Sequence, residues 1–239
     1  MVKTCLFFLF LAGSVLFAAE PDGKVWLIRH GQRCPVLAPD FDPPLTAEGR
    51  KQAQFAAGYL KKMGFRGKIY ASPYRRTLET ASIIAETLDL PIMIAPFLQE
   101  FVRFPGVHPV RERPIAELKK EFPRLVSSPE LLLNWAIRSR ETLDSVRDRF
   151  RAGLDELSLS GGREVLLVTH GAVLKAAHML ATGCGASGPW KKMNWNCCLS
   201  MYEFSPGAPP RVRLFFEVGF LPEESITSND RKKTAKKTP

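Results

Sequence analysis

Residues 24–31, K-V-W-L-I-R-H-G, decide the fold of this 239-residue chain. The letters V-W-L-I are apolar and favour β structure, and a polar cluster follows them at once. The pattern predicts a short buried strand over 24–29, with His30 just beyond its carboxyl end. Residues 163–171, R-E-V-L-L-V-T-H-G, repeat the pattern. The chain therefore carries two buried strands that each end in a His-Gly pair.

Helical and strand patterns alternate along the rest of the chain. Strands are predicted at 24–29, 68–72, 91–95, 163–169, 199–204 and 211–218, and helices at 46–64, 75–88, 141–159 and 172–180. Thr46 is expected to cap the first helix. Strands that alternate with helices imply crossovers, a mostly parallel sheet and helices on both of its faces. We therefore expect an α/β protein built as a three-layer α/β/α sandwich.

Polar side chains gather at the ends of the predicted strands. Ligands of such sheets bind at the carboxyl ends of the strands, so His30 and His170 are expected to meet there. Arginines flank these ends at positions 29, 33 and 76. Guanidinium groups match the oxygens of a tetrahedral anion, and a neutral imidazole can attack phosphorus. The pattern predicts a phosphate site with a histidine nucleophile.

Five motifs occur in order along the chain. They are R-H-G at 29–31, L-T-x-x-G-x-x-Q-A at 45–53, S-P-x-x-R at 72–76 with T-A at 80–81, L-x-E at 98–100 and V-T-H-G at 168–171. Together they resemble the histidine phosphatase superfamily, also called phosphoglycerate mutase-like. The resemblance runs from about residue 25 to 218 and implies the phosphoglycerate mutase-like fold. Gly171 follows the second histidine, which resembles branch 1 rather than the acid phosphatase and phytase branch.

The resemblance implies a role for each residue that matches a motif. The catalytic residues are His30, which would be phosphorylated, Arg29 and Arg76, which would hold the phosphate, His170, which would complete the pocket, and Glu100, which would protonate the leaving oxygen. No metal and no other cofactor is implied.

Two further residues are candidates for binding the substrate phosphate. Arg33 belongs to R-H-G-x-R-x-P at 29–35, which resembles a second phosphate arginine of the phytase branch. Asn196 resembles a pocket-edge asparagine that precedes a late strand in relatives. A simple turn residue explains Asn196 equally well.

The resemblance implies a phosphatase that hydrolyses phosphomonoesters through a phosphohistidine. One alternative is a phosphomutase, although residues 32–35, Q-R-C-P, replace the stretch with tryptophan and asparagine that follows the first motif in glycolytic mutases. The other alternative is a non-catalytic relative that binds a phospholigand. The expected partner is a phosphorylated small molecule or a phosphoprotein.

The middle segment, residues 101–140, is interrupted by five prolines. The prolines break it into short pieces, and we expect it to form a lid or substrate-facing insertion. Within the catalytic domain, expected at 20–222, this segment is the part that would choose the substrate.

The amino-terminal residues 1–19 pair Lys3 with an apolar run that is short for a membrane span. They predict a signal peptide, with an uncleaved membrane anchor as the alternative. The expected location is therefore outside the cytoplasm, periplasmic or extracellular. The remaining cysteines, Cys34, Cys184, Cys197 and Cys198, allow three complete pairings, while 197 and 198 also read as strand residues on opposite faces.

The formal charge of +10 comes from 34 Lys and Arg against 24 Asp and Glu. A charge of this size invites a nucleic-acid interpretation. Residues 230–239 alone contribute +4, and they contain no large apolar side chain. The end of the chain, 223–239, is therefore expected to be a basic, disordered tail, and no nucleic-acid partner is expected.

Overall fold

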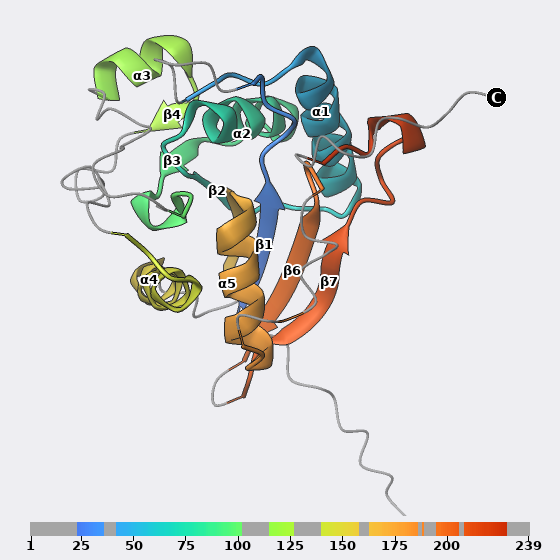
Figure 1. Ribbon diagram of the computed structural model, residues 1–239. Coiled ribbons are helices and arrows are strands. Elements are labelled where there is room, and N and C mark those ends of the chain that lie inside the picture. The colour runs from blue at the N-terminus through green and yellow to red at the C-terminus, as the bar shows by residue number, and fades with distance from the viewer. Residues whose placement is uncertain are drawn as a thin grey trace, which may run out of the picture.

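A seven-stranded mixed sheet forms the centre of the computed structural model, which describes residues 23–35, 42–101, 115–126, 140–157, 163–185, 188, 195–205 and 208–228 (Figure 1). The strands are β1 Gly23–Arg29, β2 Lys68–Ala71, β3 Ile92–Ile94, β4 Leu125–Val126, β5 Arg163–Thr169, β6 Leu199–Phe204 and β7 Arg211–Glu217. The helices are α1 Ala47–Lys62, α2 Arg75–Leu88, α3 Ile115–Glu121, α4 Leu143–Leu157 and α5 Gly171–Thr182, with short 3₁₀ turns η1 Pro96–Leu98 and η4 Glu223–Ser225.

The strand order is β4-β3-β2-β5-β1-β6-β7. Neighbours from β4 to β1 run parallel, whereas β6 is antiparallel to both β1 and β7. The register of β1 on β5 pairs Arg29 with Thr169. The residues that follow these two strands, His30 and His170, therefore leave the sheet side by side.

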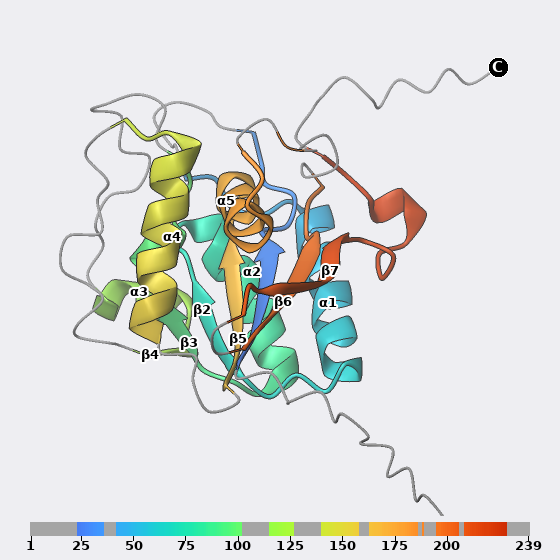
Figure 2. The same cartoon turned by 90° about the horizontal axis from the view of Figure 1, so that it is seen from below.

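Helices cover both faces of this sheet, as Figure 2 shows. Trp26 and Ile28 of β1 point into a core with α1 and α2, and the alternate residues Val25 and Leu27 point into a second core with α4 and α5. The period of two along a strand produces this division. The predicted three-layer α/β/α sandwich is confirmed.

The start of α1 is tied to the loop that follows β1. Thr46 is the N-cap, as predicted, and its Oγ1 accepts a hydrogen bond from the backbone N–H of Gly49 at 2.9 Å. The backbone N–H of Thr46 donates to the carbonyl of Gln32 at 2.9 Å. This contact holds the loop that carries the His-Gly pair against the helix.

Two segments hold elements that the sequence patterns did not predict. In the middle segment, residues 115–126 form α3 and the edge strand β4, which pairs in parallel with β3. Residues 223–228, assigned to the disordered tail, instead form η4 and hydrogen-bond to the domain. A two-residue strand and a single 3₁₀ turn are too short to produce a periodic pattern.

The signal or anchor prediction falls on residues 1–19, which lie outside the described part of the chain. It stays a prediction, as does the location that depends on it. Within the described ranges, no helix is both long and apolar enough to cross a membrane.

The different surroundings of two glycines in α1 predict that replacing them with alanine has opposite effects on stability. A Cβ on Gly49 would overlap the carbonyl oxygen of Gln32, whereas a Cβ on Gly58 would meet nothing within 4 Å. We expect Gly49→Ala to lower the free energy of unfolding by about 1 to 3 kcal/mol. Gly58→Ala should raise it by about 0.5 to 1 kcal/mol. Urea unfolding of the two variants measures both values, and equal effects would contradict the predicted contact.

Candidate active site

His30 and His170 lie together at the carboxyl ends of β1 and β5. The backbone N–H of His30 donates to the carbonyl of Thr169 at 3.0 Å, which extends the ladder by one residue. The two imidazole centroids are 5.3 Å apart, and both rings are almost fully buried. The structure thus places next to each other two histidines that are 140 positions apart in the chain.

The hydrogen bonds assign the tautomer of each neutral imidazole. Nδ1 of His30 lies 2.7 Å from the carbonyl oxygen of Gly31, and a carbonyl only accepts. Nδ1 therefore carries the proton, and the lone pair stays on Nε2. In His170 the assignment is reversed, because Nδ1 lies 3.1 Å from an Arg76 nitrogen that only donates, while Nε2 lies 2.9 Å from the hydroxyl of Ser72.

Both histidines are held in the neutral state. Burial lowers the pKa of His30 well below its usual value, and the positive charges of Arg76 and Arg29 lower it further. Burial also lowers the pKa of His170, again with Arg76 as the next cause. A neutral His30 with its lone pair on Nε2 is a nucleophile, so the environment favours the reactive form.

Arg29 and Arg76 line the site as buried cations, with 5% and 6% of their surfaces exposed. Arg29 ends β1, and Arg76 lies in the first turn of α2, with its guanidinium 4.3 Å from the ring centre of Tyr74. The Nε of Arg76 is buried and has no hydrogen-bond partner among the described residues. Buried positive charge with an unused donor is a binding site for an anion.

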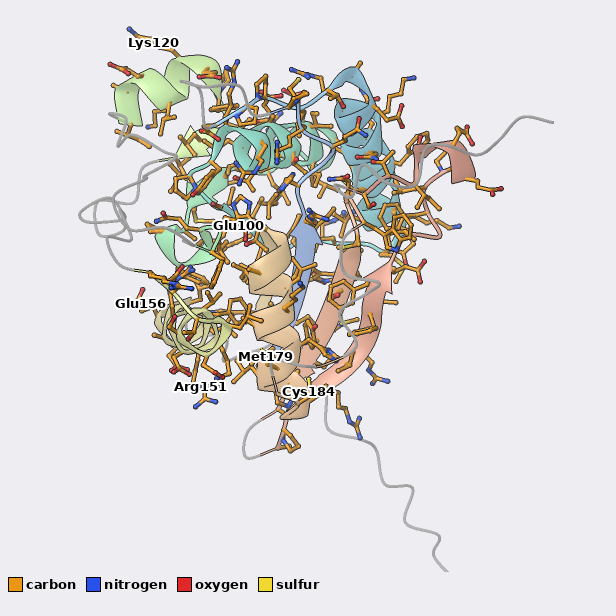
Figure 3. The ribbon with its side chains drawn as sticks, viewed as in Figure 1. Glu100, Lys120, Arg151, Glu156, Met179 and Cys184 are labelled. Carbon is orange, nitrogen blue, oxygen red and sulfur yellow. The ribbon has the colours of Figure 1, made fainter. Side chains whose placement is uncertain are left out.

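Glu100 follows η1 at the same end of the sheet. Its Oε2 lies 3.9 Å from Nδ1 of His170, and its Oε1 accepts a hydrogen bond from the backbone N–H of Phe101 at 3.0 Å. Figure 3 labels Glu100 beside the beginning of α5, which starts directly after His170. The side chain is 32% exposed, so this carboxyl group lies near His170 and is also open to solvent.

The structure gives Arg33 and Asn196, the two further phosphate-binding candidates, different surroundings. Arg33 forms a backbone bridge with Leu45, and its guanidinium donates to the carbonyl of Cys34 at 3.0 Å. Its charge lowers the pKa of His30 less than any other cause does. Asn196 is fully buried, and the next residue, Cys197, donates its backbone N–H to the carbonyl of His30 at 3.3 Å.

Sequence reasoning missed three side chains of the site. Ser72 and Tyr74 both contact His170. They lie in the S-P-x-x-R motif, and this place in the motif could have indicated that they belong to the site. Asp42 gave no signal. Its carboxylate accepts from the backbone N–H of Arg75 at 2.9 Å and lies 3.5 Å from Arg76, so it caps α2 from another segment.

The four cysteines of the folded domain are free thiols. Cys197 packs in the core shared with α1, and Cys198 packs in the core shared with α4 and α5, so they do face opposite sides of the sheet. Burial raises the pKa of the Cys198 thiol to about 12 and raises that of Cys197 as well. Both thiols therefore serve as apolar core residues. In the described part of the chain, no group of three or more side chains is arranged to hold a metal ion.

These features together define the class of site. Two buried arginines and a pair of neutral imidazoles at the carboxyl end of the sheet form a site suited to a phosphoryl group. The sequence pattern of the histidine phosphatase superfamily, branch 1, matches residues 25–216. The chain belongs to this superfamily, as its motifs indicated.

Individual relatives carry both phosphatase and mutase names. The uncharacterized phosphatase PhoE of Bacillus subtilis is 31% identical over 191 residues, which cover 76% of this chain and 88% of the relative. The probable phosphoglycerate mutase GpmB of Yersinia enterocolitica is 29% identical over 190 residues, covering 76% and 85%.

Solved structures share the fold. A mycobacterial glucosyl-3-phosphoglycerate phosphatase in complex with inorganic phosphate superposes with a TM-score of 0.60 at 21% identity, covering 84% of this chain and 100% of that one. The ecdysone phosphate phosphatase of Bombyx mori in complex with tungstate gives 0.59 at 21%, covering 81% and 92%. At this level of identity the likeness concerns the fold alone.

The lowered pKa values predict how the two histidines titrate. We expect His30 and His170 to stay neutral through pH 6.5 in the ligand-free protein, while the denatured chain titrates near 6.5. Because the unfolded state then binds more protons, their contribution to stability is complete above about pH 6.5 and is lost as the pH falls below it. NMR titration of the imidazole resonances measures this. A titration of either ring near pH 6.5 in the folded protein would contradict the assignment.

Proposed function

We propose that this protein is a phosphatase that hydrolyses phosphomonoesters through a phosphohistidine on His30, with Glu100 as general acid. The observation that carries the proposal is the orientation of the His30 ring. Nδ1–H of His30 donates to the Gly31 carbonyl, so Nε2, on the opposite side of the ring, carries the lone pair. The buried arginines near this ring would bind the phosphoryl group that the lone pair attacks.

The proposed reaction has two steps. In the first, Nε2 of His30 forms a bond to phosphorus, the bond from phosphorus to the ester oxygen breaks, and Glu100 gives its proton to the departing alkoxide. In the second, water attacks phosphorus, its proton goes to the Glu100 carboxylate, and the bond to Nε2 breaks. Arg29 and Arg76 hold the phosphoryl oxygens in both steps, and the Nε2–H of His170 joins them when it exchanges the Ser72 hydroxyl for a phosphoryl oxygen. The chain's own side chains thus account for every proton.

The role of Glu100 is supported by where its carboxyl group lies. It approaches Nδ1 of His170 to 3.9 Å and keeps about a third of its surface in solvent, so it can exchange protons with water between the two steps. The substrate would be a phosphorylated small molecule or a phosphoprotein.

A phosphomutase remains the second candidate, because the GpmB relative carries a mutase name. A mutase returns the phosphoryl group to another oxygen of the substrate, whereas a phosphatase gives it to water. We expect release of inorganic phosphate from 3-phosphoglycerate to exceed its conversion to 2-phosphoglycerate. The reverse ratio would replace the phosphatase proposal by the mutase one.

Loss of the nucleophile should abolish turnover. We expect His30→Ala to lower kcat by at least about 10³-fold, and the wild-type protein to yield a phosphoprotein that is stable in alkali and labile in acid. His178→Gln is the matched control, because that histidine packs on Phe215, outside the site. Full activity of His30→Ala would exclude the mechanism. Phosphate binding without any turnover of the wild type would instead indicate a non-catalytic relative.

The effect on kcat of removing the general acid should depend on the leaving group of the substrate. An alkoxide needs a proton to leave and p-nitrophenolate does not. We therefore expect Glu100→Gln to lower kcat about 10²-fold or more for an alkyl phosphate, and less than about tenfold for p-nitrophenyl phosphate. Glu156→Gln, on the exposed side of α4, is the control. Equal losses on both substrates would remove Glu100 from the acid role.

A further inference from the structure

The segment 223–228 lies beyond residue 216, where the match to the superfamily ends, yet it is tied to the catalytic loop. It follows β7 and returns to α1, where Ser225 and Thr227 contact the fully buried side chain of Gln52. Gln52 in turn contacts the loop that follows His30. The segment therefore reaches the active-site loop through a single glutamine.

The direction of each hydrogen bond in this chain of contacts is fixed by the backbone. The N–H of Gln32 donates to Oε1 of Gln52 at 2.8 Å, which assigns the oxygen of that amide. Nε2 of Gln52 then donates to the carbonyl of Ser225 at 2.7 Å and to Oγ1 of Thr227 at 2.8 Å. Because a backbone N–H only donates and a backbone carbonyl only accepts, the amide has one orientation.

The same direction continues to Asn196. Oγ1 of Thr227 accepts from Gln52, so its own proton is available for Oδ1 of Asn196 at 3.1 Å. The backbone N–H of Asn196 donates to the carbonyl of Thr227 at 2.9 Å. With its oxygen on Thr227, the amide of Asn196 must direct its NH₂ group away from the carboxyl-terminal segment.

This NH₂ group is an unused donor on the residue that precedes the backbone contact to His30. Nδ2 of Asn196 is buried and has no hydrogen-bond partner within the described ranges, although the remaining polar groups of the chain of contacts are satisfied. The next residue, Cys197, adopts a left-handed backbone with φ 53°, unusual for a side chain with a Cβ, and donates to the carbonyl of His30. A buried donor without a partner marks a place for a ligand acceptor.

We propose that Gln52 and Thr227 are positioning residues that hold the Asn196 amide as a phosphate donor next to His30. The proposal rests on the phosphate site of the proposed function and extends it to Thr227, which lies outside the superfamily match. Thr227 sets which atom of Asn196 faces the site, and Gln52 sets the direction of the Thr227 hydroxyl.

The test compares three variants in binding inorganic phosphate by calorimetry, which requires no turnover. Thr227→Val keeps the shape and removes the hydroxyl, so we expect phosphate affinity to fall on the order of tenfold, the value of about one hydrogen bond. Thr227→Ser keeps the hydroxyl and should bind as the wild type does. Asn196→Ala should show the same loss as Thr227→Val.

The double variant separates positioning from anchoring. If Thr227 acts through Asn196, adding Thr227→Val to Asn196→Ala causes no further loss of phosphate affinity. Additive losses, or Thr227→Val with affinity within about twofold of the wild type, would overturn the proposal. In turnover, KM should rise while kcat changes less, which a general loss of stability would not produce.

Two further measurements keep the test decisive. If Thr227→Val fails to fold by circular dichroism, Asn196→Asp decides the question. It keeps an oxygen for Thr227 and replaces the donor with a carboxylate, so phosphate affinity should fall by more than tenfold. Unchanged affinity in that variant would overturn the proposal. Failure of the proposed function would appear separately, as full activity of His30→Ala with phosphate binding intact.

Discussion

The parallel pairing of β1 with β5 is the constraint on which the site depends. Its register places Arg29 opposite Thr169, so the chain leaves both strands at the same level and the two histidines follow as neighbours. A shift of this register by one residue would turn every side chain of β1 to the other face of the sheet, so residues of one core would point into the other. Both cores depend on that alternation, so the packing that folds the domain also aligns the two histidines.

Two buried cations concentrate positive charge at the site. Arg29 and Arg76 are buried, and Asp42 lies 3.5 Å from Arg76 while its oxygens also accept from the start of α2. Burial and the same positive charges keep His30 neutral by lowering its pKa. In the proposed function, the arginines that bind the phosphoryl group are therefore also the ones that keep the nucleophile neutral. The formal charge of +10 is thus partly a property of this one site.

The sequence was sufficient to predict the sandwich and the core of the site, because both rest on periodic or local signals. Alternating apolar residues predicted β1 and β5, and the His-Gly pairs after them located His30 and His170. The strand β4, the cap that Asp42 gives to α2 and the docking of Thr227 could not be predicted. Each depends on contacts between distant segments, for which two or three residues leave no pattern in the sequence.

The polarity of the hydrogen bonds explains why so many distant segments converge here. Gly31, Ser72 and Arg76 orient the imidazoles, and Gln52 and Thr227 orient the Asn196 amide. The direction of each bond follows from a group that only donates or only accepts, or from a group whose other hydrogen bond is already made. Two acceptor atoms remain in this network: Nε2 of His30 carries a lone pair, and Nδ1 of His170 accepts from Arg76. The carboxylates of Asp42 and Glu100 approach Arg76 and His170 to 3.5 Å and 3.9 Å. An anion in the proposed site would therefore be bound mainly by the guanidinium groups, while the lone pair of His30 stays available to attack it.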